Sequence, residues 1–155
     1  MKLGIALLIG LSPVRMDAQL VTKKALTLEA VKKIAAAAEA EALKNKWNMA
    51  ISIVDDGGHM LYFERMDGTQ LASIELAQMK ARTALLFRRP TKVLQGWLNG
   101  GAINLLEQPG VAPDEGGVPI IVDGEVIGAV GASGASGAQD AQVSAAGAAA
   151  IAKPQ

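Results

Sequence analysis

The side chains available for chemistry are few, because the sequence has one histidine and no cysteine. His59 follows Gly57-Gly58 and opens an apolar segment, so we expect it at the start of a strand and partly exposed. A lone imidazole excludes metal sites built on histidine pairs, but it can be one axial ligand of a haem iron. The alternative is a structural or merely solvated turn residue. Possible second ligands in the sequence are Met49, Met60, Met66, Met79 and Tyr62.

Several cations favour a second chemistry, the binding of a small carboxylate. Arg65 and Arg88 are expected at the ends of elements, where a planar guanidinium can clamp a carboxylate. Lys80 shares a helical face with Thr83. The glycine-framed loop Glu115-Gly116-Gly117 is the segment around which these cations would act. The alternative is an ordinary solvated basic face.

Other catalytic devices are missing. The lack of cysteine excludes thiolate nucleophiles, thiolate metal sites and disulfides. Ser133 lies among glycines without the G-x-S-x-G spacing of a nucleophile elbow. Gly128, Gly131 and Gly134 do not have the spacing of a dinucleotide-binding fingerprint. The backbone around 133–138 either binds an anion before the last helix or forms a small-residue loop for tight packing.

Composition narrows the classes of partner. A chain of 155 residues is the size of one domain, and half of its residues are hydrophobic, so it can bury a substantial core. It has 15 basic and 15 acidic residues, and only 3% are aromatic. Without a basic excess or interleaved aromatic residues, the composition excludes a nucleic-acid partner.

The N-terminus resembles a secretory signal peptide over residues 1–18. Lys2 precedes an apolar run from Leu3 to Leu11, and cleavage after Ala18 would leave Gln19 as the mature N-terminus. We therefore expect a periplasmic or secreted protein. The alternative is a cytoplasmic protein in which this segment is an uncleaved strand or helix. The run is too short to span a membrane, which takes about 20 apolar residues.

The first half of the chain predicts two long helices around a β-hairpin. Thr27 is a suitable N-cap for an alanine-rich helix that ends near Lys46. Strands are expected over 49–54 and 59–65, joined by a turn at Asp55–Gly58, and a second helix over 71–86. Thr91 is expected to cap a short helix that ends at Leu98.

The second half predicts another hairpin and a last helix. Strands over 118–122 and 125–132 flank Asp123-Gly124, and Gly128 and Gly131 indicate a bulge or a close backbone approach. A helix is expected over 139–152, and a short fifth strand within 102–110. Two hairpins flanked by helices predict an α+β fold with an antiparallel sheet of about five strands.

These segments resemble the HbpS/GlcG-type family. The resemblance covers residues 25–152 and rests on Val54–Leu61, Arg65–Gly68, Lys80–Ala84, Gly116–Ile120 and Gly124–Ala129. The chain is similar also to the C-terminal domain of PduO-type adenosyltransferases. This resemblance implies a profilin-like antiparallel sheet with packed helices, a homo-oligomer, and extracellular or periplasmic haem binding. Other members of the family occur in glycolate-utilisation operons.

The family's ligand residues match this sequence only in part. A threonine that coordinates haem iron after a Pro-Gly pair is replaced by Val111, and the second glutamate of an E-x-x-E iron pair, which begins at Glu75, is Gln78. His59 is the substitute that the GlcG-type branch implies. The candidate metal ligands are His59 and Glu75. The candidate ligand-binding residues are His59, Arg65, Met66, Lys80, Arg88, Glu115, Gly116 and Gly117.

Three functions remain open at this point. One is an exported haem-binding protein that stores, traffics or degrades haem as an assembly. The second is an enzyme or accessory protein that acts on a small carboxylate. The third is a non-catalytic assembly module whose alanine-rich helices make the contacts between subunits.

Overall fold

Four strands pair in one antiparallel sheet in the order β2-β1-β4-β3. The structure is a computed structural model that describes residues 19–151. Its strands are β1 (Ala50–Asp55), β2 (Met60–Arg65), β3 (Gly117–Val122) and β4 (Glu125–Ser133). The two predicted hairpins are therefore present, and the pairing of β1 with β4 joins them into one sheet.

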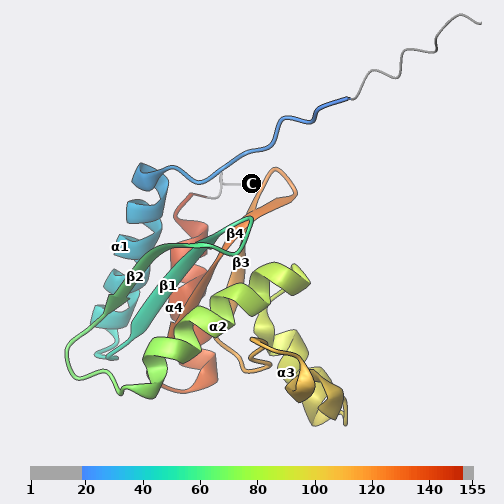
Figure 1. The fold of residues 1–155 in the computed structure, drawn as a ribbon. Coiled ribbons are helices and arrows are strands. Elements are labelled where there is room, and N and C mark those ends of the chain that lie inside the picture. The colour runs from blue at the N-terminus through green and yellow to red at the C-terminus, as the bar shows by residue number, and fades with distance from the viewer. Residues whose placement is uncertain (1–18, 152–155) are drawn as a thin grey trace, which may run out of the picture.

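Helices cover both faces of this sheet (Figure 1). α1 and α4 lie side by side on one face, and α2 lies on the other, mainly over β4. α3 and a 3-10 helix, η1, connect α2 to the second hairpin. The helices are α1 (Leu28–Lys44), α2 (Ala72–Phe87), α3 (Thr91–Asn99), η1 (Ile103–Glu107) and α4 (Gly137–Ala149). The predicted α+β class is confirmed.

The core is divided by the sheet. Ile51 and Ile53 of β1 pack with Ile34 of α1 on one face, whereas Val54 packs with Leu85 of α2 on the other. This division follows from the alternation of side chains along a strand. α2 comes closest to β4 at Gly131, where an added Cβ would lie 2.1 Å from the Ala77 carbonyl oxygen. The close backbone approach expected at Gly131 is therefore present.

The ends of the outer helices follow their capping residues. The Thr27 hydroxyl accepts a hydrogen bond from the Ala30 N–H (3.2 Å), as expected for an N-cap. α1 ends two residues earlier than predicted, and Lys46 is left-handed with a φ of 61°. α4 begins two residues earlier than predicted, because Gln139 reaches back to accept a hydrogen bond from the Ser136 N–H (3.1 Å).

Two sequence predictions are wrong. No fifth strand exists in the described part of the chain, and the segment proposed for it contains η1. In η1, Leu105 is buried while Ile103 and Leu106 are exposed, so the side chains do not alternate between buried and exposed as they would in a half-buried strand. Thr91 does not cap α3, because Pro90 occupies the N-cap position and the Thr91 hydroxyl accepts from the Gly117 N–H instead (2.9 Å).

The sheet carries a bulge in its second hairpin. Ile120 is opposite Gly128, but Ile121 is opposite Val126, so Ile127 is the extra residue on β4. The predicted signal peptide lies outside residues 19–151. Within that range, no helix is long and apolar enough to cross a membrane.

The close packing at Gly131 predicts a contrast between two glycine substitutions. Gly131→Ala is expected to lower the free energy of unfolding by about 3 kcal/mol or more, because the new methyl group meets backbone atoms of α2. Gly96→Ala is the matched control. A Cβ on Gly96 meets no atom within 4 Å, so alanine should stabilise α3 by about 0.5–1 kcal/mol. Urea unfolding measures both values, and equal effects would contradict the packing.

Candidate functional site

His59 lies in the turn that joins β1 to β2. Its side chain is 81% exposed, and its Nδ1 lies 3.4 Å from Asp55 Oδ1. The same carboxylate oxygen accepts hydrogen bonds from the N–H groups of Gly57 (2.9 Å) and His59 (2.8 Å). Asp55 therefore fixes the turn and contacts the Nδ1 edge of the exposed imidazole. A carboxylate behind a histidine is a common arrangement around bound metals.

The environment of Asp55 keeps it charged. Desolvation alone would raise its pKa, but the hydrogen bonds from His59 and Gly57 and the charge of the His59 ring outweigh it. The net result is a pKa below the ordinary value of the carboxyl group. In the neutral form of the imidazole, an ionised Asp55 favours the tautomer with its proton on Nδ1, and in that tautomer Nε2 carries the free electron pair.

A groove of about 450 Å³ opens beside this turn, and we call it the hairpin groove. The His59 ring does not itself line the groove, but His59 lies two residues after the lining residue Gly57 in the same turn. The groove is formed by the turns of both hairpins, the C-terminal end of α2 and the segment before α1. Its lining residues are Lys23, Lys24, Asp56, Gly57, Leu85, Leu86, Arg88, Gly124, Glu125, Val126 and Ile127.

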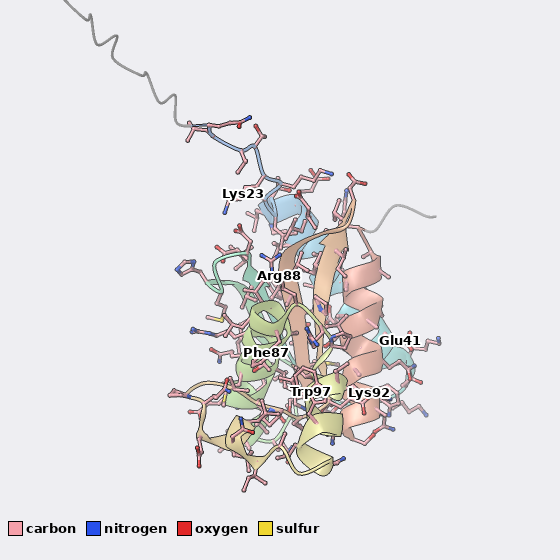
Figure 2. All side chains as sticks on the ribbon, turned by 90° about the vertical axis from the view of Figure 1, so that its right-hand side faces the viewer. Lys23, Glu41, Phe87, Arg88, Lys92 and Trp97 are labelled. Atoms are coloured by element: carbon pink, nitrogen blue, oxygen red, sulfur yellow. The ribbon has the colours of Figure 1, made fainter. Side chains whose placement is uncertain are left out.

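The hairpin groove combines apolar walls with three cations. Lys23 pairs with Asp56, and Lys24 pairs with Asp123. Arg88 makes no ion pair with any residue in the range 19–151, and its φ of 51° places it in the left-handed conformation at the end of α2. In Figure 2, Lys23 and Arg88 lie toward the same end of the molecule. Such a groove suits a flat apolar ligand that carries carboxylates.

Lys80 lies in a different place, inside the protein. Only 1% of the residue is exposed, and its Nζ lies 2.9 Å from Asp140 Oδ2 and 2.7 Å from Asp114 Oδ2. Asp140 is also buried, and its Oδ1 accepts a hydrogen bond from the Ala135 N–H (3.0 Å). Desolvation raises the pKa of Asp140, against the hydrogen bond and charge of Lys80, and the charge of Asp114 adds to the rise.

Gly116 and Gly117 lie against Lys80, a cation that the sequence analysis placed around this loop. The φ of Gly116 is 141°, and an added Cβ would lie 2.8 Å from both Lys80 Cδ and the Ala132 carbonyl oxygen. The Gly116 carbonyl accepts a hydrogen bond from the Ser144 hydroxyl (2.7 Å). Glu115 turns away and pairs with Lys92 (3.1 Å). This cluster is packed too tightly to admit a ligand, and it positions the start of β3.

The structure does not gather the predicted carboxylate clamp in one place. Arg65 and Met66 line a second groove, of about 410 Å³, with Glu39 of α1. Lys80 is buried in its ion pairs, and Arg88 lies in the hairpin groove. The three cations therefore belong to three separate environments of a single chain.

Glu75 lines a fourth environment, a groove of about 440 Å³ beside Pro109 and Gly110. Its neighbour Gln78 donates a hydrogen bond from Nε2 to the Ile74 carbonyl (2.9 Å). Within residues 19–151, no three carboxylate or imidazole side chains are grouped to hold a metal ion. Glu75 lines this groove but His59 does not, so the two candidate metal ligands are not brought together.

Sequence reasoning missed the partners of Lys80. Asp114 and Asp140 lie far from Lys80 in the sequence, and no spacing pairs them with it. One sequence feature does indicate that Lys80 is buried. It shares a face of α2 with Ser73, Ala77 and Ala84, and small residues of this kind favour close packing. A lysine on such a face needs a buried counter-charge.

The sheet order, the helices on its two faces and the glycine-rich start of β3 define a small α+β domain. The family model "Haem degrading protein HbpS-like" matches residues 26–149, and the chain belongs to this family. The predicted resemblance is therefore confirmed.

Relatives of known sequence and structure agree with this assignment. Protein GlcG of Escherichia coli K12 is 48% identical over 132 residues, which cover 85% of this chain and 98% of GlcG. The crystal structure of a double mutant of Streptomyces reticuli HbpS has a TM-score of 0.82 at 34% identity, covering 93% of this chain and 99% of that one. The structure of a PduOC–haem complex has a TM-score of 0.76 at 31% identity, covering 83% and 96%.

The buried cluster predicts a large cost for removing its cation. Lys80→Met should lower the free energy of unfolding by about 3–5 kcal/mol near neutral pH, because the buried Asp140 carboxylate loses its counter-charge. Loss of the cation pushes the pKa of Asp140 further up, so the folded variant binds a proton more readily than the unfolded chain. The loss should therefore shrink as the pH falls toward about 4.

The matched control for this variant is Asp114→Asn. The Asp114 side chain is 49% exposed, so its removal should cost less than about 1 kcal/mol. Denaturant unfolding at several pH values measures both variants. Equal costs, or a Lys80→Met deficit that grows as the pH falls, would contradict the buried pair as described.

Proposed function

We propose that this protein is an exported haem-binding protein that stores or hands on haem as a homo-oligomer. The observation that carries the proposal is the hairpin groove, which contains Arg88 and adjoins the turn that presents His59 to solvent. Membership of the HbpS-like family supports it, as does the likeness to PduOC, a protein that was crystallised with haem.

The groove meets three needs of a haem ligand. Leu85 and Val126 offer apolar surface to the porphyrin, and Arg88, which has no ion pair with the described residues, is available for a propionate. Lys23 and Lys24 lie at the same groove and can exchange their carboxylate partners for the ligand's. His59 supplies an imidazole whose Nε2 can bind the iron, which would contribute the redox and ligand-binding chemistry of the complex.

The open setting of His59 supports reversible binding. An imidazole that is 81% exposed, beside a groove open to solvent, does not enclose its ligand in the way that a buried haem pocket does. This arrangement favours storage or transfer of haem over its retention as a permanent cofactor. Export is the part of the proposal that rests on residues 1–18, and a mature protein that begins at Gln19 would support it.

Haem titration of the purified protein tests the proposal. The wild type should bind one haem per chain with a sharp Soret band, and His59→Ala should weaken binding by about tenfold or more with a shifted band, because the axial ligand is lost. Saturable binding with an unchanged band in His59→Ala would show that His59 is not the ligand. If the wild type shows no saturable haem binding, the proposed function is wrong.

Two arginine variants locate the propionates. Arg88→Ala should weaken haem binding by roughly three- to tenfold, because the propionate loses one partly solvated, charge-assisted hydrogen bond. Arg65→Ala is the matched control in another groove and should leave the affinity unchanged. If Arg65→Ala weakens binding and Arg88→Ala does not, the ligand lies in the groove between α1 and β2. Stabilisation by glycolate in a thermal-shift assay, with none by haem, would favour the small-carboxylate function instead.

A further inference from the structure

The segment before α1 leaves the domain as an extended arm, residues 19–24 (Figure 1). None of these residues forms a backbone hydrogen bond with another residue of the range 19–151. Two ion pairs hold the base of the arm instead. Lys23 pairs with Asp56 in the turn of the first hairpin, and Lys24 reaches the turn of the second hairpin, at Asp123. Ion pairs between solvent-exposed side chains are weak, so the arm is only loosely held.

The arm carries two apolar side chains that nothing covers in the described chain. Leu20 is 92% exposed and Val21 is 87% exposed, more than any other large hydrophobic residue in the range 19–151. Because apolar surface leaves water favourably, these side chains would pack on any apolar surface that the arm can reach. Their position, directly before two lysines, gives the arm an apolar part and a charged part.

A partly apolar surface lies within that reach. Lys23 and Lys24 are themselves lining residues of the hairpin groove. Leu20 is three residues before Lys23, which is at most about 11 Å of extended chain. An arm that folds back on its base therefore brings both apolar side chains over the groove, against a molecule bound in it.

The residues that follow the arm are anchored. Leu26 packs on the core between α1 and the sheet, and a Cβ on Gly128 of β4 would lie 2.7 Å from Leu26 Cδ1. Thr27 then caps α1. Ala25 is exposed and lies between the anchor and the arm, so the arm can turn there without disturbing the helix.

We propose that the arm closes over a ligand in the hairpin groove, and that Leu20 and Val21 form the side of the binding site that the domain leaves open. The carboxylates of the ligand favour closure, because they compete with the aspartates of the two hairpin turns for Lys23 and Lys24. Closure by exposed ion pairs and two apolar side chains slows the release of the ligand without making its binding permanent. The inference rests on the proposed function, since it concerns the same groove.

The rate of haem release tests this closure. Haem-loaded protein is mixed with an excess of apomyoglobin, and the rate of transfer gives the dissociation rate. The double variant Leu20→Ser/Val21→Ser should release haem about tenfold faster, with little change in the association rate, because the ligand loses its apolar cover. Leu43→Ser is the matched control and should leave the rate unchanged. Leu43 is also exposed, at 58%, but it lies near the end of α1 and does not line the hairpin groove.

Trypsin measures the position of the arm itself. Lys23 and Lys24 lie in exposed chain without secondary structure, so the ligand-free protein should be cut after them. Haem should slow these cuts about tenfold in the wild type, because the closed arm is no longer accessible. The same cuts in the double variant should be slowed much less.

Two results would overturn the closing arm. They are equal rates of release from the wild type and the double variant, and trypsin cuts that haem slows equally in both. A flat apolar anion without iron, anilinonaphthalene sulfonate, separates this failure from that of the proposed function. A wild type that binds no haem but releases this dye more slowly than the double variant does would support the arm and contradict the haem function. Saturable haem binding with release that does not depend on Leu20 and Val21 would do the opposite, and a wild type that binds neither molecule would contradict both.

Discussion

The buried charge of Lys80 is the constraint on which the rest of the structure depends. A buried ammonium group costs several kcal/mol unless carboxylates compensate it, so α2 can occupy its place only where Asp140 and Asp114 meet it. These partners come from α4 and from the loop before β3, so one side chain ties helices of both layers to the sheet. The glycines at 116 and 117 follow from the same requirement, because any larger residue would fill the space that Lys80 occupies.

The ligand site is a consequence of that arrangement. Once α2 is fixed in its middle by Lys80, its C-terminal end lies between the turns of the two hairpins, with Leu85 on the sheet and Arg88 at the groove. The buried cluster therefore has a positioning role, whereas binding falls to the exposed end of the domain. This separation explains how a rigid core can carry an open groove lined by turn residues.

Local signals in the sequence were sufficient for most of the fold. Thr27 predicts the start of α1, and Asp123-Gly124 predicts the second hairpin, because both signals are complete within a few residues. The predicted fifth strand failed because η1 has too few buried residues to show its period. The assignment of Thr91 as a cap failed because Gly117, far along the chain, uses its hydroxyl.

The candidate site was harder to predict than the fold. His59 could be singled out by its type alone, but the separation of Arg65, Lys80 and Arg88 depends on which side of each element faces the core. The hairpin groove joins the segment before α1, two turns and a helix end, which no spacing in the sequence brings together.

A crystal structure of the haem-loaded protein would test the central claim of this account most directly. The account predicts iron bonded to His59 Nε2, the porphyrin against Leu85 and Val126, and a propionate at Arg88. Haem bound instead beside Pro109-Gly110, or with its iron far from His59, would contradict it.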